Sequence, residues 1–115
     1  MKDINELVQQ SSQEIRRGLL VISVLASLRN SQYGYSLIKT LEAKGISIEG
    51  NTLYPLLRRL EEQALLASEW DTEVGSKPRK YYHITNKGEE VLKELKGIWY
   101  ETVNNMDEIL GGYDG

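Results

Sequence analysis

The side chains best suited to chemistry lie near the start of the segment Asn51–Leu66: Thr52, Tyr54, Arg58 and Arg59. Hydroxyl and guanidinium groups donate hydrogen bonds to base edges and phosphate oxygens, and the start of a recognition helix presents such groups to DNA. The apolar residues of the same segment recur at three- and four-residue steps: Leu53, Leu56, Leu57 and Leu60. This spacing forms one apolar face on a helix and leaves the other side chains outside. The segment therefore predicts either a DNA-reading helix or an ordinary surface helix.

A second group of basic side chains follows further along the chain: Lys77, Arg79, Lys80 and Lys87, with no acidic residue between them. The formal net charge is −3, but residues 88–115 carry 2 basic and 7 acidic residues, whereas residues 1–87 carry 12 and 10. For nucleic-acid binding the distribution of charge matters more than its sum. A local positive patch is therefore compatible with an acidic protein, although a solvated loop with a few lysines would have the same composition.

The composition excludes several other kinds of chemistry. The absence of cysteine excludes disulfides and thiolate metal sites and fits a reducing cytosol. His83 is the only histidine, and no residue pattern would assemble an acid, a base and a nucleophile. The longest uncharged apolar run has 11 residues, 18–28, fewer than the ~20 that cross a bilayer, and Asp3 and Glu6 do not suit a signal peptide. We expect a cytoplasmic protein that is not an enzyme and has no membrane segment, metal or cofactor.

Three helices are expected to position the side chains of Asn51–Leu66. Ser11 and Glu14 resemble a capping box, which predicts a helix from there to Leu28 that is apolar nearly all round. A second helix is predicted over Tyr33–Lys44, ended by a left-handed Gly45. The third should begin at Asn51 or Thr52, because Pro55 has to lie in or near its first turn.

A β-hairpin is expected to follow the third helix. Residues 66–70 alternate between apolar and polar side chains, residues 71–78 are rich in turn formers, and residues 79–85 are rich in aromatic and branched side chains. The hairpin tip is predicted at residues 74–79. Three helices followed by a basic hairpin is the order of a winged helix-turn-helix domain, so we expect a mainly α fold with a small β-hairpin, in which residues 1–85 form the DNA-binding domain.

The sequence also resembles a known family in three pieces: YGYSLIKTLE from Tyr33, NTLYPLLRRLEEQALL from Asn51 and GSKPRKYYHITNKGEE from Gly75. In this order and spacing they are similar to the PadR family of bacterial transcriptional regulators. Two departures are Asn51, where the family often has glycine, and Ala64, where glycine is also commoner. We expect the DNA-binding surface to comprise Tyr35, Asn51, Thr52, Tyr54, Pro55, Arg58, Lys77, Arg79 and Lys80.

The remaining segment, residues 86–115, is predicted to be a long helix, Asn86–Leu110, with a short tail. Its apolar residues form a coiled-coil-like seam: Leu92, Leu95, Trp99, Val103, Met106 and Leu110. Such a seam requires a partner, which is either the chain's own small domain or a second subunit. We expect the second, because two-fold symmetric DNA readers span two half-sites. The resemblance implies the same arrangement, a dimer joined through this helix and the first helix, in the compact branch of the family.

Trp99 has a more specific expected role. Its position resembles that of the tryptophan with which multidrug-sensing PadR members stack planar aromatic compounds at the dimer centre. Two symmetry-related indoles could accept a planar ligand between them. We expect the effector site to include Trp99, Ile15, Leu19 and Val103; the alternative is that Trp99 only packs in the dimer core.

The function expected from these features is that of a sequence-specific transcriptional regulator. It would bind double-stranded DNA at a two-fold symmetric operator as a homodimer, acting as a repressor relieved by a planar hydrophobic small molecule. Two alternatives stay open: a winged-helix module that binds proteins and not DNA, and a DNA-binding regulator without a small-molecule effector.

Overall fold

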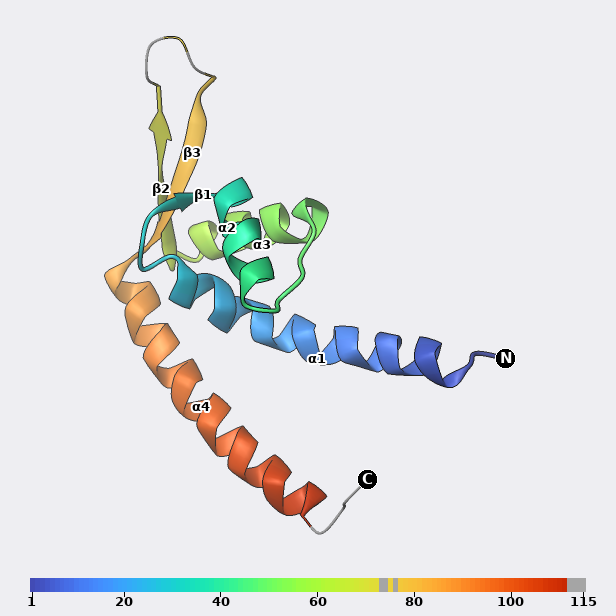
Figure 1. Cartoon of the computed structure of the whole chain (residues 1–115). Coiled ribbons are helices and arrows are strands. Elements are labelled where there is room, and N and C mark those ends of the chain that lie inside the picture. Colours follow the sequence, from blue (N-terminus) through green and yellow to red (C-terminus); the bar gives the residue numbers. More distant parts are fainter. Residues whose placement is uncertain (73–74, 76, 112–115) are drawn as a thin grey trace.

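The computed structural model describes residues 1–72, 75 and 77–111. Its elements follow the chain in this order: α1 (Ile4–Ser27), β1 (Gln32–Tyr33), α2 (Gly34–Ala43), α3 (Gly50–Glu62), β2 (Leu66–Asp71), β3 (Arg79–Ile84) and α4 (Asn86–Leu110). The helix α2 packs against both α1 and α3, the β2–β3 hairpin projects from the domain, and α1 and α4 diverge from it toward the two termini (Figure 1). The expected mainly α fold with a winged helix and a long terminal helix is therefore confirmed.

The hydrophobic core is built mainly from leucines of all four helices. Leu25, Leu37, Leu53 and Leu57 have no exposed surface, and Tyr82 of β3 closes the core with 8% of its surface exposed. Removing any of these large side chains would leave a cavity, which typically costs about 2–5 kcal/mol. The core fixes α3 with its apolar face inward.

The first helix begins earlier than expected. It starts at Ile4, because the Asp3 side chain accepts a hydrogen bond from the Glu6 N–H at 2.8 Å and caps the helix there. The pair Ser11 and Glu14 therefore lies inside α1, and the prediction of a helix start at Ser11 was wrong. A Ser-x-x-Glu pattern can also occur within a helix, where the N–H groups already have partners. The extra turns carry exposed apolar side chains and are not buried all round.

The helices α2 and α3 match the expectations with one shift. Gly45 has a φ of +87°, the left-handed conformation expected after α2. The helix α3 begins at Gly50, and Glu49 caps it without a side-chain hydrogen bond, so Asn51 and Thr52 are helical residues and not caps. Pro55 consequently lies in the second turn and not the first. The Asn51 carbonyl that loses its partner lies on an exposed residue, where water can replace the missing N–H.

The sheet has three antiparallel strands in the order β1-β3-β2. Its hairpin pairs Leu66 with Ile84 at the base and Asp71 with Arg79 toward the tip. Sequence patterns did not predict β1, because two residues are too few to show an alternation. This strand ties the start of α2 to the wing.

The fourth helix has the expected bounds and is anchored at its start. The Thr85 hydroxyl donates a hydrogen bond to the Ala64 carbonyl at 2.7 Å and accepts one from the Gly88 N–H at 3.0 Å. Gly88 lies against the Leu65 carbonyl, 2.2 Å from the place where a Cβ atom would stand. Ala64 itself adopts a φ of +62°, a conformation that favours glycine.

Within the described ranges, no helix is long and apolar enough to cross a membrane.

Candidate nucleic-acid interface and apolar cleft

The polar side of α3 faces solvent. Leu53, Leu56, Leu57 and Leu60 are all buried in the core. The side chains expected to contact DNA all lie on the exposed side: Asn51, Thr52, Tyr54, Pro55 and Arg58. The helix thus presents hydroxyl, amide and guanidinium groups in a row, which is what the prediction of a DNA-reading surface requires.

Tyr54 is more constrained than an ordinary exposed side chain. Its ring lies over Gly34, where an added Cβ would be 2.5 Å from the Tyr54 Cε1 atom, and it also borders Gly50. The side chain keeps 42% of its surface exposed. Two glycines therefore allow the start of α2, the start of α3 and this ring to approach closely. The sequence analysis did not identify Gly34 as a close-approach site. The signal that could have indicated it is a glycine standing between two tyrosines, Tyr33 and Tyr35.

A small cleft of about 210 Å³ joins three distant segments of the chain. It brings together four of the expected DNA-binding residues, Tyr35, Tyr54, Arg79 and Lys80. Tyr35 is 67% exposed, and the Lys39 ammonium group lies 5.5 Å from the centre of its ring. The cleft therefore lies between α3, the start of α2 and the wing.

Stacked side chains connect β1 to the outer part of the wing. The rings of Tyr33 and Tyr81 stack with centroids 3.9 Å apart, and the Arg79 guanidinium lies over Tyr33 at 5.1 Å. The Tyr33 hydroxyl donates a hydrogen bond to Asp71 at 2.9 Å. Hydrogen bonding with Tyr81, then burial and the Asp71 carboxylate, raises the pKa of Tyr33, so this phenol stays protonated and can keep donating.

Lys80 is held within the domain in a way the sequence did not indicate. Its ammonium group forms an ion pair with Glu61 of α3 at 3.2 Å and lies 5.8 Å from the Trp70 ring centre. Ser68 also donates a hydrogen bond to Glu61 and, together with Lys80, lowers the pKa of that carboxyl, while burial opposes the shift. By contrast, Lys77 and Arg79 are exposed. Residues 73, 74 and 76, in and beside the expected tip, lie outside the described residues.

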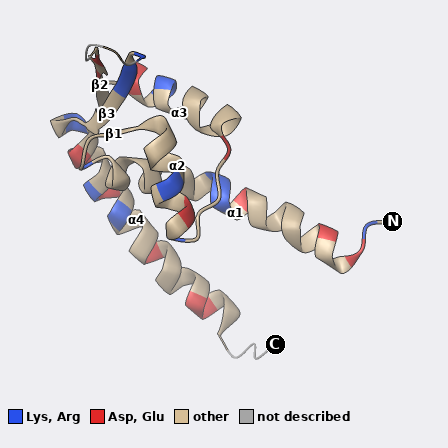
Figure 2. Cartoon of the chain, turned by 45° about the horizontal axis from the view of Figure 1, so that its top comes forward, with Lys and Arg blue, Asp and Glu red and all other residues tan. Residues whose placement is uncertain are grey.

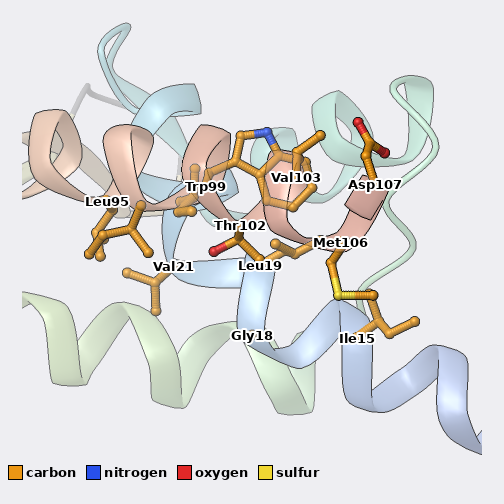
Figure 3. Close-up of a pocket in the computed structure, with 12 residues that line it drawn as sticks. Ile15, Gly18, Leu19, Val21, Leu95, Trp99, Thr102, Val103, Met106 and Asp107 are labelled. Carbon is orange, nitrogen blue, oxygen red and sulfur yellow. The ribbon is translucent and has the colours of Figure 1, made fainter. Parts of the chain in front are cut away.

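A second candidate site is an apolar cleft of about 670 Å³ between α1 and α4. It contains all four expected effector residues, Ile15 and Leu19 from α1 and Trp99 and Val103 from α4 (Figure 3). Met106 and Ile98 also line it, and its polar lining side chains are those of Thr102 and Asp107. Figure 3 shows Trp99, Val103 and Asp107 at successive turns of α4. The size suits a drug-sized ligand, for which cavities of roughly 300–1,000 Å³ are typical.

The expected dimer seam divides into two parts. Leu92 is only 3% exposed and belongs to the core of its own chain, and Leu95 packs against that core. Placing Leu92 on a free seam was therefore wrong, because the first turns of α4 are needed to cover the hairpin base. Beyond them the apolar side chains are less covered: Trp99, Met106 and Leu110 expose 39%, 41% and 55% of their surface.

Comparisons with known proteins agree with this architecture. Residues 21–94 match the model of the transcriptional regulator PadR-like family. A PadR family transcriptional regulator from Eggerthella lenta has 50% identity and a TM-score of 0.89, over 94% of this chain and 96% of that one. A PadR-like transcriptional regulator from Bacillus cereus has 31% identity and a TM-score of 0.77, over 86% and 98%. Transcriptional regulator Rv3488 from Mycobacterium tuberculosis is 35% identical over 72% of this chain and 74% of its own length.

Proposed function

Because this chain belongs to the PadR-like family of transcriptional regulators, we propose that it is a sequence-specific repressor that binds DNA as a homodimer and is released by a planar aromatic compound. Members of the family are DNA-binding regulators and not enzymes. The observation that best supports the proposal is the complete division of α3 into a buried leucine face and an exposed polar face.

DNA recognition is assigned to α3 and the wing together. Asn51, Thr52 and Arg58 have side chains that can bond to base edges in the major groove. Lys77 and Arg79, both exposed, can reach phosphates beside that groove. Lys80 can join them only if it leaves Glu61, so we assign it a smaller share of the binding than Arg79.

The homodimer is assigned to the uncovered parts of α1 and α4. Exposed apolar side chains occur along both helices: Ile4, Leu7, Val8, Ile15, Ile98, Met106, Ile109 and Leu110. Extended exposed apolar surface on a small soluble protein marks an interaction site. A second copy covering it would set two recognition helices at a fixed separation, as a two-fold symmetric operator requires.

The effector is assigned to the cleft between α1 and α4. A planar aromatic compound could stack on the Trp99 indole and displace water from the apolar walls. Such a compound can weaken DNA binding only if it favours a geometry of α1 and α4 that spaces the recognition helices differently.

The DNA-binding proposal is tested with the purified full chain and its own upstream DNA, across a salt series. Replacing Lys77 and Arg79 with alanine should weaken binding to cognate and random DNA alike and lower the log–log salt slope by roughly 0.9 for each phosphate that is no longer neutralised. Replacing Asn51 or Arg58 with alanine should instead cost on the order of 1–3 kcal/mol on cognate DNA if the residue reads a base. Equal weakening on both DNAs for every α3 variant would contradict sequence reading by α3, and no binding by the parent chain would favour a protein-interaction module.

The effector proposal is tested by tryptophan fluorescence with a panel of planar aromatic compounds. Trp70→Phe removes the signal of the exposed second tryptophan. In that background a bound compound should quench Trp99. Trp99→Ala in the otherwise unchanged chain, measured by isothermal titration calorimetry, should bind no compound while DNA binding persists. Ligands that bind undiminished without Trp99 would place the site elsewhere, and a panel without any ligand would favour a packing role for Trp99.

A further inference from the structure

The helix α1 presents a polar face toward the start of α3. Its polar side chains, at helical spacing, are Gln13, Arg16 and Arg17, and the buried Leu20 borders them. They line a cleft of about 370 Å³ together with the loop that precedes α3 and its first turn: Ser47, Ile48, Glu49 and Thr52. In Figure 2 a basic stretch of α1 lies beside this loop. The cleft is therefore continuous with the surface that α3 would place on DNA.

The two arginines of this face are available to a ligand. Both side chains are exposed, and the ion pairs found among the described residues, Arg29 with Glu89 and Lys80 with Glu61, do not involve them. Glu49 is the one carboxylate lining the cleft, so two guanidinium groups against one carboxylate leave it with net positive charge.

We infer that Arg16 and Arg17 bind backbone phosphates of the DNA strand next to the major groove entered by α3. This inference rests on the proposed DNA-binding function and extends it from α3 and the wing to the first helix. A guanidinium group suits this role because it forms two parallel hydrogen bonds with a phosphate and is weakly hydrated. Thr52, which lines the same cleft from α3, places the arginines beside a side chain assigned to DNA contact.

A phosphate-binding arginine pair has a defined chemical signature. Phosphate contacts fix the position of a protein on DNA but carry no sequence information, so removing them should weaken cognate and random DNA equally. Each neutralised phosphate also releases counterions, so removing the arginines lowers the salt dependence of binding. Glu49 should act in the opposite direction, because its carboxylate repels the same phosphates.

The test uses a double variant of the full chain that carries both Arg16→Ala and Arg17→Ala. It is compared with the parent chain and with a matched control. The control is Lys93→Ala with Lys96→Ala, which removes two exposed cations from α4, a helix directed away from α3 (Figure 1). In fluorescence anisotropy titrations the arginine variant should bind both DNAs more weakly and lower the salt slope by roughly 0.9 for each phosphate left without its arginine. The lysine variant should keep a slope within about 0.5 of the parent, because its cations touch no phosphate. Glu49→Gln should bind both DNAs more tightly.

Two further measurements separate a DNA contact from a structural effect. Arg16→Lys with Arg17→Lys keeps both cations and should restore the parent's slope, although not all of its affinity. Phosphate ethylation interference should disappear at specific positions in the arginine variant, and these should differ from the positions affected in the Lys77 and Arg79 wing variant. An arginine variant with the parent's affinity, slope and interference pattern overturns the inference while the wing variant still tests the proposed function. A parent chain that does not bind DNA overturns both.

Discussion

The two amphipathic helices α3 and α4 bury their apolar residues to very different extents. All four leucines of the α3 stripe are buried, whereas α4 buries Leu92 and leaves Trp99, Met106 and Leu110 substantially exposed. Both helices have a regular apolar face in the sequence, so periodicity alone does not distinguish them. The part of the chain around α3 thus covers its apolar side chains within one chain, and we call the described residues of the range 20–92 the closed half. The far parts of α1 and α4, which we call the open half, leave apolar side chains exposed in the single chain, and we propose that a second copy covers them.

A pair of identical truncations should affect the two halves very differently. Leu57→Ala in the closed half should lower the free energy of unfolding by about 2–5 kcal/mol, because Leu57 has no exposed surface. Leu110→Ala in the open half should change the stability of a single chain by less than about 0.5 kcal/mol. Urea unfolding at several protein concentrations measures both. Comparable destabilisation at high dilution would show that the end of α4 packs within its own chain.

A pair of glycines on α4 tests where the closed half ends. Gly88→Ala should destabilise the domain by about 1–3 kcal/mol, since the new Cβ would meet backbone atoms of Leu65 that cannot move independently. In the single chain, a Cβ atom added at Gly97 would have no other atom within 4 Å. Gly97→Ala should therefore stabilise the helix by about 0.5–1 kcal/mol. Thermal unfolding followed by circular dichroism reports both values. A destabilising Gly97→Ala would instead indicate that a partner approaches α4 closely at this turn.

The smallest expected effect concerns the turn between α3 and β2. Ala64 has a φ of +62°, and a left-handed conformation costs a residue with a Cβ about 1–2 kcal/mol. Relief of this strain is partly offset by the greater freedom of glycine in the unfolded chain, so Ala64→Gly should stabilise the closed half by about 0.5–1 kcal/mol. Dimerisation should not change, because the turn lies in the closed half. A destabilising effect measured by urea unfolding would contradict the assigned backbone conformation.

Much of the closed half could be predicted from the sequence because local signals agree with the tertiary fold. The leucine spacing of α3, the glycine after α2 and the alternation in the hairpin each identify their element, and the structure confirms them. The strand β1 was missed because it consists of two residues and owes its existence to pairing with β3. The start of α1 was placed too late. The Ser-x-x-Glu pattern of Ser11 and Glu14 looks the same inside a helix as at a helix N-terminus.

The candidate sites were predicted less evenly. Tyr35, Tyr54 and Arg79, all predicted to bind DNA, line one cleft. The ion pair between Lys80 and Glu61 depends on a contact between β3 and α3 that no local pattern reveals. The four residues predicted to bind an effector line one cleft. Leu92 was assigned to the seam because a heptad pattern does not show which turns are covered by the chain's own hairpin. The roles of these residues in binding stay predictions.

The open half is tested most directly by the mass of the full chain in solution, measured by sedimentation equilibrium. We predict a species of twice the chain mass of 13.1 kDa, because under the proposed function a second copy covers the open half. Val103→Glu with Met106→Glu should convert it to a folded monomer, since two carboxylates would have to be buried in an apolar interface. A parent chain that sediments at 13.1 kDa over the whole measurable concentration range would contradict a dimer built on α1 and α4.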